Sequence, residues 1–215
     1  MNDYSFISGG MAIGTRRDSG KRDAILRAAI QVIAETGYHH AQISRIARAA
    51  GVADGTVYLY FKNKEDLLLS ILRESIGEVV HQLRQALLEE RGATAKLRRI
   101  VEVYLGDLGR DAKLAMVTQV HLRQVDAEMR RQIGDIMKPF YHLLDDVIDE
   151  GIQEGVFSQE VGHRIARRMI FGTLDETVTA WVLSGSKYDL GALAPDIVRV
   201  LCYGISSREQ VEEEV

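Results

Sequence analysis

Residues 42 to 64 contain the pattern that most constrains the fold of this chain. Apolar residues recur at helical spacing from Ile43 to Ala50, and Gly51 can adopt the positive φ that ends a helix. A second short helical pattern follows the glycine, and Val52 and Val57 can fill the angle between the two helices. Two short helices joined at a glycine are typical of a helix-turn-helix.

The polar side chains of the second helix and of the residues after it are left for the outer surface. Thr56 offers a hydroxyl and a methyl group, and Tyr58, Tyr60, Lys62 and Lys64 can donate hydrogen bonds to phosphates. The segment therefore predicts a surface that contacts DNA.

The order of these residues resembles the N-terminal signature of the TetR family of one-component transcriptional repressors. The matching elements are Gly37-Tyr38, Ile46-Ala47, Ala50-Gly51-Val52, Gly55-Thr56, Tyr58, Phe61 and Asn63-Lys64. The motif and the resemblance together predict that double-stranded operator DNA is bound by Gln42, Ser44, Gly55, Thr56, Tyr58, Tyr60, Lys62 and Lys64.

Two positions depart from the family pattern. The family often has Thr where this chain has Gln42, and Ser where it has Ala53. Gln is a poor helix cap, so we expect the first helix of the pair to lack a side-chain cap. We expect Asp54 to cap the second helix instead, although its charge opposes a nearby phosphate.

Charge is divided unevenly along the chain. Residues 1 to 64 carry nine Lys/Arg against five Asp/Glu, whereas residues 65 to 215 carry eighteen against twenty-six. A basic end on an acidic body suits a protein that meets nucleic acid at one end only.

The remaining composition predicts a cytoplasmic protein. Cys202 is the single cysteine, so it cannot form an intramolecular disulfide. The N-terminus lacks the features of a secretory leader, and no apolar run approaches the ~20 residues that span a bilayer, so no membrane partner is expected.

Helical periodicity extends along the rest of the chain and predicts an all-α fold. The resemblance implies a TetR-like arrangement of about nine helices. A first helix is expected from Ser19 to Thr36, and a long helix opened by Asn63 is expected to join the two parts of the chain. Later helices are predicted over residues 94 to 108, 112 to 124, 126 to 151 with a kink or break at Pro139, 161 to 183 and 190 to 205.

The pattern divides the chain into four parts. We expect a flexible basic arm, a three-helix helix-turn-helix domain, a helical ligand-binding and dimerisation domain, and an acidic tail. Their predicted bounds are residues 1–18, 19–65, 66–206 and 207–215.

Catalytic and metal-binding patterns fail in this sequence. The six histidines do not follow a zinc-enzyme spacing, and the glycines at positions 9, 10 and 14 neither follow a strand nor open a βαβ unit. We therefore expect a protein that is not an enzyme, with no catalytic residues, no metal ion and no cofactor.

The body of the chain combines broad apolar side chains with clustered arginines. Such a combination suits a long apolar ligand with an anionic head, although ordinary core packing and ion pairs within helices account for the same residue types. The predicted ligand-binding residues are Tyr104, Met116, Val120, Arg123, Arg130, Met137, Phe140, Arg168, Phe171 and Trp181.

A narrower resemblance favours one ligand class. Residues 122 to 124, 148 to 156, 166 to 181 and 187 to 190 are similar to the body of TetR-type repressors of fatty-acid degradation, which release DNA when they bind long-chain acyl-CoA. The resemblance implies a repressor that binds a palindromic operator and takes long-chain acyl-CoA as inducer. It also implies a homodimer formed by the last two helices, where Gly172 allows close approach.

Two other functions remain open at this point. The aromatic and acidic residues of the body also suit a TetR-type efflux regulator that senses drugs. A helical enzyme or carrier that handles acyl-CoA is the alternative from a different class, but it leaves the helix-turn-helix unexplained.

Overall fold

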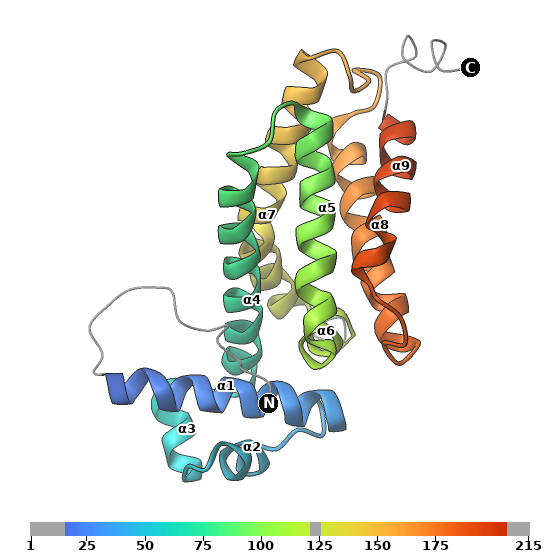
Figure 1. Ribbon diagram of the computed structural model, residues 1–215. Helices are drawn as coiled ribbons and strands as arrows, with labels where there is room; N and C mark the ends of the chain where they lie inside the picture. The colour runs from blue at the N-terminus through green and yellow to red at the C-terminus, as the bar shows by residue number, and fades with distance from the viewer. Residues whose placement is uncertain (1–15, 121–125, 206–215) are drawn as a thin grey trace. The chain divides into compact units, whose positions relative to one another are not determined.

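The computed structural model describes residues 16–120 and 126–205, and all of its long elements are α-helices (Figure 1). The all-helical class and the helix-turn-helix predicted from the sequence are confirmed in this part of the chain. The chain divides into two compact units, Met1–Ile71 and Leu72–Val215.

The first unit contains α1 (Arg16–Thr36), α2 (Ile43–Ala50), α3 (Asp54–Tyr60) and the beginning of α4 (Lys64–Leu87). Helix α1 packs against both α2 and α3. It begins before the predicted Ser19, so the end of the predicted basic arm is helical. The interior of this unit is mainly apolar, although Ser70 is also buried. Its apolar residues with at most 2% exposure include Ile25, Leu26, Ile33, Ile46, Ala47, Val57, Phe61, Leu67 and Leu68.

Two glycines end helices in the first unit as the sequence predicts. Gly51 follows α2 with φ 69°, and its N–H lies against the last carbonyls of that helix. Gly37 follows α1 with φ 79° and donates its N–H to Ile33 O at 2.8 Å. An L side chain is strained at such angles, so these positions favour glycine.

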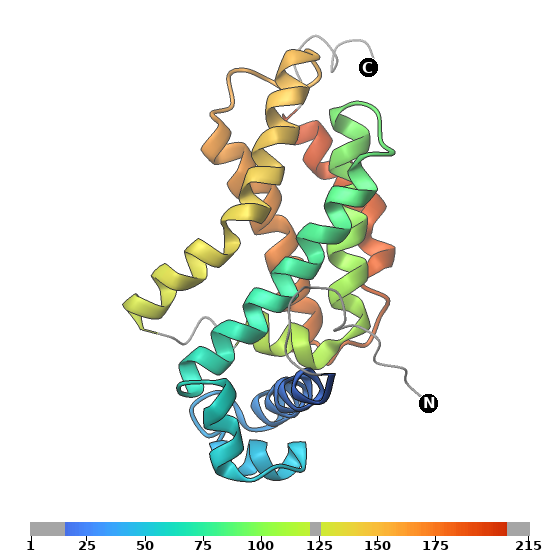
Figure 2. The same cartoon turned by 90° about the vertical axis from the view of Figure 1, so that its left-hand side faces the viewer.

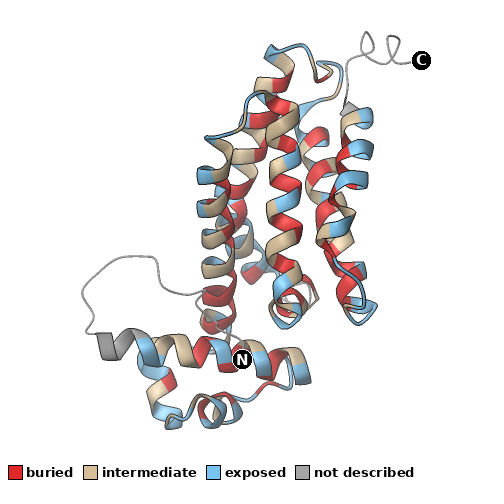
Figure 3. Cartoon of the chain, in the orientation of Figure 1, coloured by how far each residue is buried: buried red, intermediate tan, exposed pale blue. Residues whose placement is uncertain are grey.

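The second unit is a bundle of long helices. It comprises the remainder of α4, α5 (Ala93–Arg110), α6 (Ala112–Gln119), α7 (Ala127–Gln153), α8 (His163–Leu183), a 3₁₀ turn (Gly191–Leu193) and α9 (Ala194–Ile205). Helix α5 packs against α7, α8 and α9, and α6 packs against α8. The buried positions form continuous faces along these helices (Figure 3).

Three of the later elements add detail to the predicted ones. Helix α6 ends at Gln119, and residues 121 to 124 of the predicted helix lie outside the described residues. Helix α7 continues through Pro139, and its N-terminal half leans away from the direction of its C-terminal half (Figure 2), so of the two predicted outcomes the kink is confirmed and the break is wrong. The segment predicted as one helix from Leu190 begins with the 3₁₀ turn. In the described parts of the chain, no helix is long and apolar enough to cross a membrane.

Candidate nucleic-acid interface and ligand-binding body

Helix α3 presents a narrow exposed face. Asp54, Gly55, Tyr58 and Leu59 are exposed on it, whereas Val57 is buried. Asp54 and Tyr58, Gly55 and Tyr58, and Gly55 and Leu59 are three or four positions apart, so these residues share one side of the helix. Among the other predicted DNA-binding residues, Gln42 and Lys62 are exposed, and Ser44, Thr56, Tyr60 and Lys64 are half-buried.

Neither helix of the pair has a side-chain N-cap. Gln42 stands at the N-cap of α2 and makes no capping hydrogen bond, as predicted. The prediction that Asp54 caps α3 is wrong, because Ala53 occupies the cap position and Asp54 is the first helical residue. The Asp54 carboxylate is exposed at the beginning of α3, where its negative charge interacts favourably with the positive end of the helix dipole.

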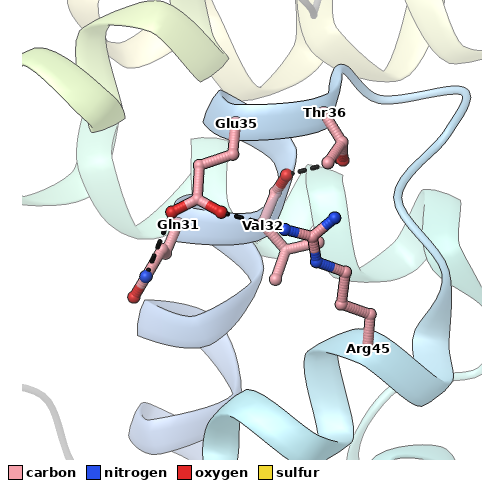
Figure 4. A network of polar contacts seen from close by, with 5 residues as sticks. All are labelled: Gln31, Val32, Glu35, Thr36 and Arg45. Atoms are coloured by element: carbon pink, nitrogen blue, oxygen red, sulfur yellow. Dashed lines mark hydrogen bonds and ion pairs between the residues drawn. The ribbon is translucent and has the colours of Figure 1, made fainter.

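An ion pair braces α2 against α1 (Figure 4). The Arg45 guanidinium donates to Glu35 Oε2 at 3.1 Å, and Gln31 donates to the other oxygen of the same carboxylate at 3.1 Å. About half of the Arg45 side chain stays in solvent, so the pair orients it more than it stabilises the fold.

Sequence reasoning missed one prominent residue of this surface. Leu59 is 81% exposed, which makes it the most exposed large apolar side chain of those described in the first unit. Its place after Tyr58 on a short helix could have identified it, but no role is predicted for Leu59 from the sequence.

The lysines at the two ends of the Lys62–Lys64 segment have different surroundings. Lys62 is exposed, and its ammonium has no partner among the described residues. The Lys64 ammonium instead donates to Tyr38 O at 2.9 Å and to His39 O at 3.2 Å. It also lies 4.6 Å from the centroid of the Tyr38 ring.

An aromatic cluster occupies the interior of the second unit. Phe140 is completely buried, and its ring centroid lies 5.5 Å from that of Tyr104, 6.4 Å from that of Tyr141 and 6.0 Å from that of Phe171. Helices α5, α7 and α8 each contribute to this cluster. It brings together three of the predicted ligand-binding residues, namely Tyr104, Phe140 and Phe171.

One polar group sits among these apolar side chains. Gln119 is 5% exposed, and its amide nitrogen donates to the Tyr104 hydroxyl at 3.5 Å. The Thr179 hydroxyl lies 3.5 Å from the Gln119 amide oxygen. These two bonds are long, so the buried amide of Gln119 is held loosely between the Tyr104 and Thr179 hydroxyls.

The other predicted apolar ligand residues have varied positions. Met137 is buried on α7, and Met116 and Val120 are half-buried on or beside α6. Trp181 is buried near the end of α8, where its indole N–H donates to Tyr188 O at 2.7 Å. That bond ties the segment after α8 back to the helix, which gives Trp181 a structural role that the sequence did not predict.

The predicted arginines are spread along α7 and α8. Arg130 and Arg168 are exposed, and Arg123 lies outside the described residues. Arg167 is tied down, because it donates to Asp145 at 2.5 Å and lies 5.4 Å from the centroid of the Tyr141 ring. Burial raises the pKa of Tyr141, with a further rise from Asp175 and an opposing effect of Arg167.

Helices α8 and α9 also carry an apolar exposed face. Ile165, Leu183, Val200 and Tyr203 are each at least 56% exposed. Gly172 lies on the exposed side of α8, and a Cβ at this position would meet nothing within 4 Å. Helices α8 and α9 pack together, and each carries large apolar side chains in solvent. This arrangement marks a candidate interaction face.

Two family models match the chain and together cover most of it. Residues 25–71 match the bacterial regulatory proteins of the tetR family, and residues 72–204 match the C-terminal region of YsiA-like proteins. The two matches meet between Ile71 and Leu72, where the chain also divides into two compact units.

Similar proteins of known structure or role span nearly the whole chain. The fatty acid metabolism regulator protein of Bacillus subtilis (strain 168) is 46% identical over 184 residues, which cover 86% of this chain and 95% of that protein. The crystal structure of the B. subtilis regulator FadR in complex with stearoyl-CoA matches with a TM-score of 0.82 and 46% identity over 85% of this chain and 98% of that one.

A second solved structure is about as similar to this chain. The fatty acid degradation regulator FadR from Bacillus halodurans matches with a TM-score of 0.81 and 49% identity over 85% of this chain and 98% of that one. These relatives are regulators, and they confirm the resemblance predicted from the sequence of both parts. The chain belongs to the TetR family of bacterial regulatory proteins.

Proposed function

We propose that the protein is a transcriptional repressor of fatty-acid degradation genes, which binds a palindromic operator as a homodimer and is released by long-chain acyl-CoA. The observation that carries the proposal is the 46% identity to the B. subtilis regulator, because it covers 95% of that protein and so includes both units. The B. subtilis FadR structure contains stearoyl-CoA, which has the long apolar chain and anionic head that this body suits.

The proposed DNA contacts lie on α2, α3 and the segment after α3. Of these contacts, Gln42, Gly55, Tyr58 and Lys62 are exposed, and Ser44, Thr56 and Tyr60 are half-buried. The N-terminal residues of the second helix of a helix-turn-helix face base edges, so Gly55 and Thr56 are placed near the bases. Tyr58, Tyr60 and Lys62 serve mainly at phosphates.

The proposed dimer interface is the exposed face of α8 and α9. Joining four helices from two protomers would cover Ile165, Leu183, Val200 and Tyr203, and Gly172 would let the backbones approach closely. Each protomer has one DNA reader, by which we mean the helix-turn-helix segment of residues 42 to 64. A two-fold dimer presents its two readers to half-sites about one helical turn apart, ~34 to 36 Å.

The proposed acyl-chain site is the interior around Tyr104, Met137, Phe140 and Phe171, whose broad side chains can repack around an alkyl chain. Met116, Val120 and Trp181 are the remaining apolar candidates. The CoA phosphates are assigned to Arg123, Arg130 and Arg168, because guanidinium groups pair with phosphate through two parallel hydrogen bonds.

A mobility shift titration tests the proposal. Stearoyl-CoA added to the purified protein on operator DNA should release the DNA, and free CoA at the same concentration should not. Apolar burial contributes ~0.8 kcal/mol per CH₂, so release should strengthen with chain length until the site is full.

The same titration separates the alternative functions. A DNA shift that ignores acyl-CoAs and is abolished by a cationic dye would replace the proposal with a drug-sensing efflux regulator. Recovery of hydrolysed ligand after incubation, instead of intact acyl-CoA, would favour an enzyme.

A further inference from the structure

Lys64 holds together the two ends of the helix-turn-helix. Its ammonium bonds to the carbonyl oxygens of Tyr38, at 2.9 Å, and His39, at 3.2 Å, which lie 26 and 25 positions earlier in the chain. Helices α2 and α3 lie between these positions. The contact therefore closes a loop that contains the whole DNA-reading segment.

The carbonyls that Lys64 binds belong to the turn after α1. Gly37 ends that helix with φ 79°, and the following carbonyls of Tyr38 and His39 point at the ammonium. The Tyr38 side chain is 6% exposed, so its ring face gives the ammonium a partly desolvated position. A cation at this place is favoured by the negative end of α1 and by the ring.

The backbone at Lys64 is fixed independently of its side chain. Asn63 caps α4 through a 2.7 Å hydrogen bond from Asp66 N, and Lys62 N donates to Asp66 Oδ2 at 3.0 Å. Leu67 and Leu68 then anchor the first turns of α4 in the interior. The Lys64 side chain consequently extends from a rigid base to a fixed pair of acceptors.

We propose that Lys64 is a positioning residue of the DNA reader, and that Lys62 supplies the phosphate contact at this end of α3. The inference rests on the proposed DNA-binding function and assigns a different role to one residue predicted to touch DNA. Two of the three N–H groups of the Lys64 ammonium are directed at backbone carbonyls, whereas the Lys62 ammonium stands in solvent.

Salt dependence of DNA binding distinguishes the two roles. Each phosphate contact contributes about 0.9 to the slope of log K against log salt, so Lys62→Met, which removes two contacts per dimer, should reduce its magnitude by about 1.8. Lys64→Met should leave the slope unchanged and weaken operator binding by roughly 3- to 10-fold, through a less ordered reader. The slopes are measured on a short duplex of arbitrary sequence as well as on the operator.

Conservative replacement gives a second comparison. Lys64→Arg keeps a cation that can bond to carbonyls and stack on the Tyr38 ring, so operator affinity should return to within about 2-fold of the wild-type value. Equal loss of salt dependence in Lys62→Met and Lys64→Met would overturn the inference while leaving the proposed function intact. Failure of the wild-type protein to bind DNA would instead overturn the proposed function.

Nuclear magnetic resonance on the unaltered protein keeps the inference testable if Lys64→Met does not fold. The ring current of Tyr38 should shift the side-chain protons of Lys64 upfield of those of Lys62. That shift should persist when DNA is added, whereas the Lys62 signals should move. A Lys64 signal that loses its upfield shift on DNA would show that the ammonium leaves the turn for a phosphate.

Discussion

The two compact units differ in how their functional side chains are held. In the first unit the predicted DNA-binding residues lie within 23 consecutive positions, residues 42 to 64, and local helix and turn geometry places most of them at the surface. In the second unit the predicted ligand residues come from α5, α6, α7 and α8 and range from completely buried to exposed. A local motif thus determines the reader, whereas long-range packing determines the body.

Because of this difference, substitutions should affect the two units in different ways. Side chains on the reader surface contact solvent, so they can be exchanged with little effect on folding. The aromatic residues of the body serve both as core and as proposed ligand contacts, so their replacement changes stability and ligand response together.

Gly172→Leu should have the largest effect, because it acts on both readers at once. A protomer has room for the side chain, since a Cβ at Gly172 meets nothing within 4 Å, so the protomer should fold. Blocked dimerisation should weaken operator binding by about 10²- to 10⁴-fold, since the two half-sites are no longer bound together. Analytical ultracentrifugation and operator titration measure the two effects.

Gly134→Leu is the matched control for this prediction. Gly134 is also exposed within a helix, and its Cβ would likewise meet nothing within 4 Å. It lies on α7 and should leave the dimer and operator affinity unchanged. A fully dimeric Gly172→Leu protein would place the interface elsewhere.

Phe140→Ala should destabilise the body by about 3 to 5 kcal/mol, because it removes a fully buried ring and leaves a cavity. Phe171 is half-buried in the same cluster, so Phe171→Ala should cost less. Denaturant unfolding followed by circular dichroism measures both. Equal losses would mean that the cluster is not packed around Phe140.

Arg130→Ala or Arg168→Ala should weaken acyl-CoA binding by roughly 10- to 150-fold, the range of a hydrogen bond to a charged group. Operator affinity without ligand should not change, because neither residue belongs to the first unit. Arg84→Ala, at another exposed arginine of the second unit, is the control. Calorimetric titration with stearoyl-CoA provides the measurement, and an unaltered affinity in both variants would remove these residues from the phosphate site.

Asp107→Asn should have the smallest effect, and the size of this effect should depend on pH. Burial raises the pKa of the Asp107 carboxyl above 3.8, against the lowering effect of Arg110, and Glu78 raises it further. The folded protein therefore holds this proton more tightly than the unfolded chain, and stability is lost as pH rises through the raised pKa. The free energy of unfolding of Asp107→Asn minus that of the wild type should therefore be larger at neutral pH than at a pH below 3.8. Urea unfolding of both proteins at both pH values measures this difference.

Much of the helical fold could be predicted, because its signals are local. Gly37 and Gly51 end α1 and α2 at the predicted positions, since positive φ is a property of single residues. The continuity of α7 through Pro139 could not be predicted, because the surrounding packing decides whether a proline bends a helix or ends it.

The exposure and contacts of some site residues could be predicted from the sequence, and those of others could not. The exposure of Tyr58 follows from helix geometry, and that of Lys62 from its place between α3 and α4. The partners of Lys64 lie 25 and 26 residues away and leave no signal at its own position. In the body, residue type identified Tyr104, Phe140 and Phe171 as a group, and packing brings them together. Residue type alone did not indicate that Trp181 bonds to the segment after α8.

In the proposed mechanism, acyl-CoA bound in the second unit and operator DNA bound to the first unit weaken each other's binding. The most direct test measures both sides of this coupling, namely the operator affinity with and without saturating stearoyl-CoA and the stearoyl-CoA affinity with and without saturating operator. Thermodynamic linkage requires the two factors to be equal, and we predict about 5- to 150-fold weakening in each direction. Operator affinity that is the same with and without bound stearoyl-CoA would contradict the account.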